Sequence, residues 1–284
     1  MMKTFPCPRL FGPVVTALML VALLATALAP EARAENRVPA IDQIVQAEIR
    51  PGWQDADGKR IAALHLRLAE GWRTYWRIPG PAGIAPQFDW SRSQNLANVT
   101  PRWPRPEVFD QDGYNSIGYA TELVLPLEIT PRNPSRPVAL NGKLTIGLCR
   151  EICIPADLTV SQPLRGNGAH DPAITAALER GPTPAGNAGL GDARCRVEPV
   201  ERGAELTLRI TLPRLGPDEH VIMELPGSGY WVSASRTWRE ADELVARATL
   251  RAPQGAPVSV SRDQLAYPIL TPEHMIEHQG CRGG

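Results

Sequence analysis

Two cysteines with three residues between them lie in the stretch GLCREICIPADL (147–158), and thiols at this spacing could do three kinds of chemistry. Cys149 and Cys153 could form a disulfide that opens and closes, a permanent structural bridge, or half of a metal site. Zinc sites use four ligands, and no second close pair of cysteines or histidines lies nearby, but copper(I) could accept two thiolates alone. The spacing leaves these three alternatives open.

A bridge between Cys149 and Cys153 requires the chain to reverse direction. Four steps along a straight strand span about 13 Å, whereas the Cα atoms of a disulfide lie about 4.4–6.8 Å apart. The reversal could be a short helical turn or a hairpin in which REI (150–152) connects two strands. Pro155 favours the hairpin, because a helix cannot easily continue through it.

The N-terminal residues indicate that the chain carrying this cysteine pair is exported. Lys3 and Arg9 precede an uncharged apolar run, and the small residues Ala32 and Ala34 occupy the −3 and −1 positions of a cleavage point after Ala34, which is typical of a signal peptide. A retained membrane anchor is the alternative. After removal of residues 1–34, 250 residues remain, with 27 basic and 29 acidic side chains. This balance argues against binding to nucleic acid, and we expect no stable membrane insertion.

The mature chain is rich in short β-forming runs and in proline. Runs of this kind, separated by turn residues, predict an all-β fold with two immunoglobulin-like sandwich domains. Between them, Asp171 and Pro172 predict the start of a short helix that Gly181 ends. We therefore expect a first domain at 38–165, a linker with a short helix at 166–191, and a second sandwich at 192–284. The expected strands lie at 60–70, 121–130, 143–148, 157–164, 204–212, 220–226, 230–238 and 243–252.

The second domain begins and ends near a cysteine, Cys195 and Cys281. Export makes disulfides possible, and a ring of 87 residues would restrict the unfolded chain by about 4.6 kcal/mol. A ring over 149–153 restricts it by only about 2 kcal/mol. We therefore expect Cys195 and Cys281 to form a structural bridge and the close pair to be the working dithiol.

A longer set of motifs resembles a known family. The segment GWRTYWRIPGPAGIAPQFDW, continued by FDQDGYNSIGY and then by LTIGLCREICIPADLTVSQPL, is similar to the periplasmic N-terminal domain of the DsbD and ScsB thiol–disulfide reductases, with the ScsB branch closer. The resemblance covers about residues 40–165. It implies an immunoglobulin-like fold with a catalytic cysteine pair, in which Cys153 would attack or accept a partner's sulfur. It also implies a cap loop at 109–119, for which Tyr114 is a candidate aromatic residue.

The resemblance also implies the partners. The family takes electrons from a membrane domain and passes them to periplasmic thioredoxin-fold proteins. No eight-helix membrane segment or C-terminal thioredoxin-like domain follows in this sequence, so we expect a separately encoded membrane reductase or a stand-alone carrier. Whether the chain is an enzyme stays open, because a relative that keeps the fold only for binding would look the same.

Other motifs compete with this interpretation. His274, Met275 and His278 could bind copper, since imidazole and thioether both suit that metal. Solvent-exposed residues at a strand end are the alternative. Trp72, Tyr75, Trp76, Trp90 and Trp103 could line a groove, although packing in the core is the simpler expectation.

The sequence thus predicts a periplasmic thiol–disulfide exchange protein. Its reaction would pass through a mixed disulfide at Cys149 and Cys153 and would need no cofactor. The alternative is a copper-handling or adaptor module with a cysteine pair that does not cycle.

Overall fold

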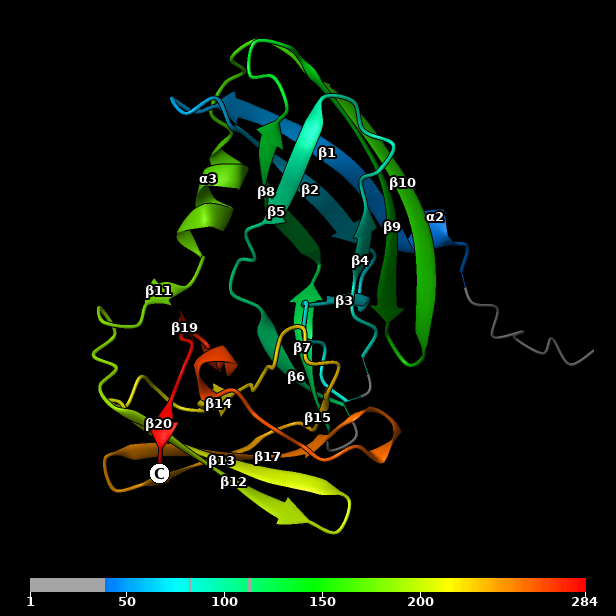
Figure 1. Ribbon diagram of the computed structural model, residues 1–284. Helices are drawn as coiled ribbons and strands as arrows, with labels where there is room; N and C mark the ends of the chain where they lie inside the picture. The colour runs from blue at the N-terminus through cyan, green and yellow to red at the C-terminus, as the bar shows by residue number, and fades with distance from the viewer. Residues whose placement is uncertain (1–38, 82, 112–113) are drawn as a thin grey trace, which may run out of the picture. The chain divides into compact units, whose positions relative to one another are not determined.

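The computed structural model describes residues 39–81, 83–111 and 114–284 (Figure 1). The proposed signal peptide, with its cleavage point after Ala34, lies outside these residues. Residues 40–284 form one compact unit. None of the described helices is long and apolar enough to cross a bilayer.

The predicted all-β class is confirmed. In the N-terminal half, one antiparallel sheet has the order β1 (Val45–Gln54), β2 (Arg60–Leu68), β8 (Glu122–Pro131), β5 (Leu96–Pro101). A second sheet has the order β10 (Cys153–Leu164), β9 (Val138–Cys149), β3 (Arg73–Tyr75), β7 (Tyr114–Ala120), β6 (Glu107–Gln111), and β4 (Gln87–Asp89) also pairs with β9. A short helix, α2 (Ile41–Ile44), precedes β1.

Alternation of side chains explains how these two sheets enclose a core. Buried residues alternate with less buried ones along most of β9 and β8, and the buried set includes Leu125, Leu127, Leu140, Leu144 and Ile146. Each is at most 1% exposed, and together they belong to one hydrophobic cluster. Strands with one buried face are typical of a sandwich.

The C-terminal half is built from two further sheets. One has the order β15 (Trp231–Val232), β17 (Glu243–Arg251), β13 (Gly203–Thr211), β12 (Ala193–Val200), β20 (Arg282–Gly283), and β16 (Arg236–Glu240) also pairs with β17. The other has the order β11 (Thr183–Pro184), β19 (Met275–Glu277), β18 (Ile269–Leu270), β14 (His220–Val221). Two 3₁₀ turns lie at η1 (Pro253–Gly255) and η2 (Arg262–Gln264).

The predicted strands are found, with two differences. The run 230–238 was expected to be a single strand, but it is divided into β15 and β16, and residues 233–235 between them belong to neither strand. The run 220–226 was expected to be a single strand, but only His220 and Val221 pair as β14. Glu224 instead forms an isolated bridge with Ala266. Pairing is interrupted because the Ile222 N–H donates to the Pro268 carbonyl, whereas Pro268 has no N–H with which to donate in return.

The predicted helix is confirmed as α3 (Pro172–Glu179). The Asp171 carboxylate accepts from the backbone N–H groups of Ala173 and Ile174, so it caps the helix as predicted. Arg50 of β1 donates to the same carboxylate at 2.7 and 3.0 Å, which ties α3 to the first sheet.

We keep the division into domains 38–165 and 192–284 as a proposal. Each segment has a hydrophobic cluster of its own. However, Leu270 and Met275 from the C-terminal segment belong to the first cluster. The two proposed domains therefore share part of one core.

Candidate functional site

The cysteine pair lies at the turn of the β9–β10 hairpin, the two long green strands of Figure 1. Cys153 is paired with Cys149, and the register continues without interruption to Leu164 opposite Val138. The two cysteine Cα atoms are 4.1 Å apart and the sulfurs are bonded. The predicted hairpin with a three-residue connection is confirmed, and the helical turn is excluded.

The two sulfurs have different environments. Cys149 is 1% exposed, whereas Cys153 is exposed at the start of an edge strand. Cys149 lies inside the sheet because β9 has neighbours on both sides, and β3 pairs Arg73 with it. A protein partner can therefore reach the sulfur of Cys153 more easily than that of Cys149.

A tyrosine from another strand contacts the exposed sulfur. The hydroxyl oxygen of Tyr75 lies 2.9 Å from Cys153 Sγ. Because a disulfide sulfur carries no proton, the hydroxyl is the donor. β3 holds this ring in place through backbone pairs with β7 and β9, and the Thr74 hydroxyl donates to the Gly147 carbonyl at 3.0 Å.

Gly147 makes room for the tyrosine ring. A Cβ atom at Gly147 would lie only 2.6 Å from Tyr75 Cδ2 and 2.8 Å from Ile84 Cβ. The glycine two residues before Cys149 is thus required by the close approach of the ring. The sequence analysis named Tyr75 only as a possible groove aromatic and missed this contact, because no local spacing links Tyr75 to Cys153, 78 residues away.

Burial keeps the Tyr75 hydroxyl protonated. Tyr75 is 3% exposed, and this burial raises the pKa of Tyr75, with a smaller opposing effect from the charge of Arg73. The hydroxyl can therefore donate across the neutral range. A hydrogen bond to an anion favours its charged form, so the same hydroxyl would stabilise a thiolate at Cys153.

The other aromatic side chains pack in the core, as the simpler expectation had it. Trp72 and Trp76 are 5% and 0% exposed and belong to the first hydrophobic cluster. Trp90 and Trp103 are partly buried against Phe88. For the cap-loop candidate, Tyr114 begins β7, and its side chain lies outside the described part of the structure.

The second cysteine pair joins the two ends of the C-terminal segment. Cys195 in β12 is bonded to Cys281, with Cα atoms 5.7 Å apart. Cys195 is 1% exposed. The residues after Cys281 form β20, which pairs with β12 in parallel, so the bridge and this pairing hold the same end of the chain.

The structure does not bring His274, Met275 and His278 together. They lie on and beside β19, a strand, so neighbouring side chains point to opposite faces. Met275 is 1% exposed in the first hydrophobic cluster, whereas the His278 ring contacts the Tyr267 ring at 5.4 Å. Among the described residues, no group of three or more His, Cys, Asp or Glu side chains could hold a metal ion.

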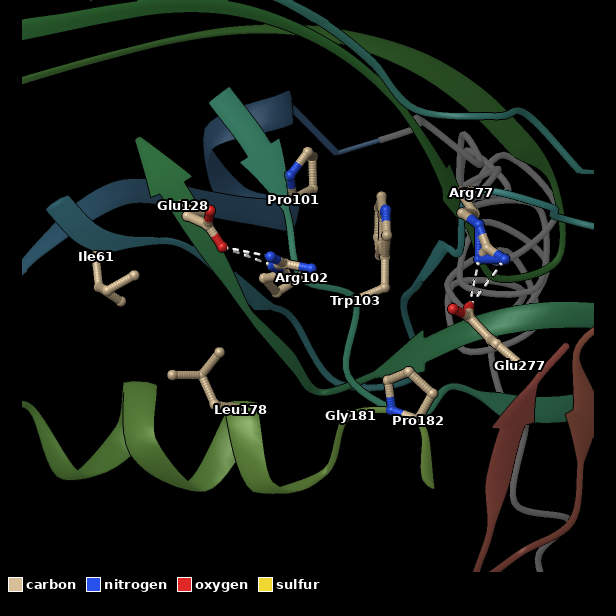
Figure 2. A pocket seen from close by; sticks show the side chains of 10 residues that line it. All are labelled: Ile61, Arg77, Pro101, Arg102, Trp103, Glu128, Leu178, Gly181, Pro182 and Glu277. Carbon is tan, nitrogen blue, oxygen red and sulfur yellow. Dashed lines mark hydrogen bonds and ion pairs between the residues drawn. The ribbon is translucent and has the colours of Figure 1, made fainter. Parts of the chain in front are cut away.

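A separate cavity of about 540 Å³ lies beside α3 (Figure 2). Glu128 accepts from Arg102 on one side, and Glu277 pairs with Arg77 at 3.0 Å on the other. Arg77 also donates to Glu224 at 2.7 Å. The charges that line this cavity are paired with one another, and none of its lining residues belongs to the cysteine site.

Comparisons with known proteins agree with the resemblance. Residues 42–164 match the family described as thiol:disulfide interchange protein DsbD, N-terminal. The crystal structure of the N-terminal periplasmic domain of ScsB from Proteus mirabilis is similar with a TM-score of 0.62 and 23% identity, over 84% of this chain and 92% of that one. The reduced N-terminal domain of Neisseria meningitidis DsbD matches at 18% identity and a TM-score of 0.26, over 48% of this chain and 96% of that one. No curated protein sequence matched the chain.

The family match covers the segment in which Cys149, Cys153 and Tyr75 come together, and the ScsB similarity extends the same fold over most of the chain. Residues 42–164 therefore form a domain that matches the DsbD N-terminal family, and the chain shares its fold with the N-terminal periplasmic domain of ScsB.

Proposed function

We propose that this chain is a periplasmic thiol–disulfide exchange protein, exported after cleavage behind Ala34. It passes electrons between a separately encoded membrane reductase and thioredoxin-fold partners through Cys149 and Cys153. The observation that carries the proposal is the asymmetry of the bridge: the exposed residue Cys153 is bonded to the buried residue Cys149.

The reaction follows from this asymmetry. In the reduced protein, the Cys153 thiolate attacks a disulfide sulfur of the partner; the new bond forms, the partner's bond breaks, and its second sulfur leaves as a thiolate. Cys149 then attacks Cys153 Sγ, which restores the intramolecular bridge and releases the partner's other thiolate. Two electrons pass from the pair to the partner. A donor dithiol from the membrane reductase reverses these steps.

The scaffold supports each step. The β9–β10 register keeps Cys149 opposite Cys153 through backbone hydrogen bonds, independently of the bridge. The resolving sulfur therefore stays close while the mixed disulfide exists. Tyr75 donates to Cys153 Sγ and favours the thiolate that attacks or leaves. Electrons travel as thiols, so the mechanism needs no bound cofactor.

Trapping of partners tests the proposal. In Cys149→Ser the attacking sulfur remains and the resolving sulfur is lost, so mixed disulfides with thioredoxin-fold proteins should accumulate in periplasmic extracts. In Cys153→Ser, the matched control, none should form. Each change should cost about 2 kcal/mol of unfolding free energy or less, because the ring is small. Equal behaviour of the two variants in the trapping assay would rule out the proposed exchange.

A further inference from the structure

The loop between the two cysteines presents an apolar side chain to solvent. Ile152 is 52% exposed and directly precedes Cys153. Among the described residues, the other large apolar side chains with comparable exposure are Val200 and Trp231, both in the C-terminal segment. Among the described residues of the part that matches the DsbD family, Ile152 is thus the exposed large apolar side chain.

The loop around Ile152 is held in shape. The Arg150 N–H donates to the Ile152 carbonyl at 3.2 Å, inside the ring that the disulfide closes. The stem of Arg150 lies over Gly71, since a Cβ atom there would be 3.2 Å from Arg150 Cδ. Ile152 is therefore presented by a preorganised loop, and contact with a partner would cost little ordering entropy.

The loop offers a partner little net charge. The guanidinium of Arg150 lies 3.9 Å from the carboxylate of the neighbouring Glu151, and both are exposed. The opposite charges largely cancel at a distance. Selection by the loop therefore depends on the apolar contact more than on charge.

The chemistry at Cys153 places a partner over this side chain. A mixed disulfide brings the partner's Cα within about 7 Å of the Cys153 Cα, and the Cα of Ile152 is only about 3.8 Å further along the chain. The residues that flank the partner's cysteine must then cover Ile152. Apolar flanking residues would bury the exposed half of the Ile152 side chain favourably. Polar flanking residues would lose hydrogen bonds to water and gain none from Ile152.

We propose that Ile152 is a specificity-determining contact, through which this protein prefers protein disulfides flanked by apolar side chains. This inference rests on the proposed exchange function and names the partner chemistry for the same site. Burial of about half an isoleucine side chain corresponds to roughly a fivefold gain in affinity.

Three disulfide substrates distinguish the effect of contact with Ile152 from the intrinsic reactivity of Cys153. Two are disulfide-bridged peptides that are identical except for leucine or serine beside the reacting cysteine, and the third is bis(2-hydroxyethyl) disulfide. The full chain, reduced beforehand with dithiothreitol and freed of it, should reduce the leucine peptide in a single turnover with an about fivefold higher second-order rate constant than the serine peptide. Ile152→Ser should abolish that preference and leave the rate with bis(2-hydroxyethyl) disulfide unchanged. Ile152→Val should keep most of the preference.

Val200→Ser is the matched control, because it removes a comparably exposed apolar side chain far along the sequence, and it should keep the full preference. An unchanged preference in Ile152→Ser, or an equal fall in its rate with all three substrates, would overturn the inference and leave the exchange function standing. Failure of the wild-type protein to reduce any of the three substrates would instead refute the proposed function, and the inference with it.

Discussion

Replacement of Tyr75 with phenylalanine removes one hydroxyl, 2.9 Å from Cys153 Sγ, and leaves the ring in its place. The ring stays because β3 is held by β7 and β9 and because Gly147 leaves space for it. In the reduced protein, the hydroxyl should donate to the Cys153 thiolate. Its loss should therefore reduce the fraction of thiolate at a given pH.

The expected size follows from the contact. A hydrogen bond to a charged group contributes about 1.5–3 kcal/mol. Because Cys153 is exposed, water replaces part of the lost bond, and we take the lower end of this range. A change of about 1.4 kcal/mol is tenfold in the thiolate-to-thiol ratio, or about one pH unit.

Alkylation measures this directly. In a Cys149→Ser background, Cys153 is the thiol of the pair that remains, and its rate of reaction with iodoacetamide is followed from pH 5 to pH 10. Tyr75→Phe should move the midpoint of the profile upward by about one pH unit. Exchange with a protein disulfide should slow by up to tenfold near neutral pH.

Tyr119→Phe is the control for loss of a buried tyrosine hydroxyl elsewhere. Tyr119 is 3% exposed, and its hydroxyl donates to the Pro104 carbonyl at 2.7 Å. This change should lower stability by about 1 kcal/mol and leave the alkylation profile unmoved. Identical midpoints in Tyr75→Phe and wild type would refute the role assigned to the hydroxyl.

Three further changes test the scaffold. Cys195→Ser should cost about 4 kcal/mol in urea unfolding, more than Cys149→Ser, because it opens an 87-residue ring; the reverse order would contradict the loop-entropy argument. Gly147→Ala should cost about 1–3 kcal/mol and slow exchange, because its Cβ displaces Tyr75, and a stable variant with wild-type exchange would contradict the packing. Hydrogen bonds from Lys59 and Arg102 lower the pKa of Glu128 below its ordinary 4.5, so its contribution to stability is present above that pH and lost as the pH falls. Glu128→Gln should therefore be less stable at pH 7, with a deficit that shrinks below pH 4.5 in urea unfolding; a deficit independent of pH would contradict this assignment.

Local sequence determined the parts of this protein that depend on a few neighbouring residues. The four-residue separation of Cys149 and Cys153, with Pro155 after them, was enough to predict the hairpin, because chain geometry leaves few ways to bring two sulfurs together. Asp171 and Pro172 likewise predicted the start of α3. In both places the constraint, disulfide geometry in one and helix capping in the other, acts between residues that are close together in the sequence.

Only the tertiary structure decided which sulfur is reachable and what contacts it. Tyr75 is 78 residues from Cys153 in the sequence, and the two meet because β10, β9 and β3 are neighbours in one sheet. The order of strands in the sheet is set by the packing of the whole core, and it cannot be predicted from the spacing of a few neighbouring residues. The same holds for Met275, proposed from its neighbours as a copper ligand but buried in the first hydrophobic cluster. Its strand β19 pairs in parallel with the distant β11, where Thr183 lies opposite Ile276, and this long-range placement determines which of its faces is buried.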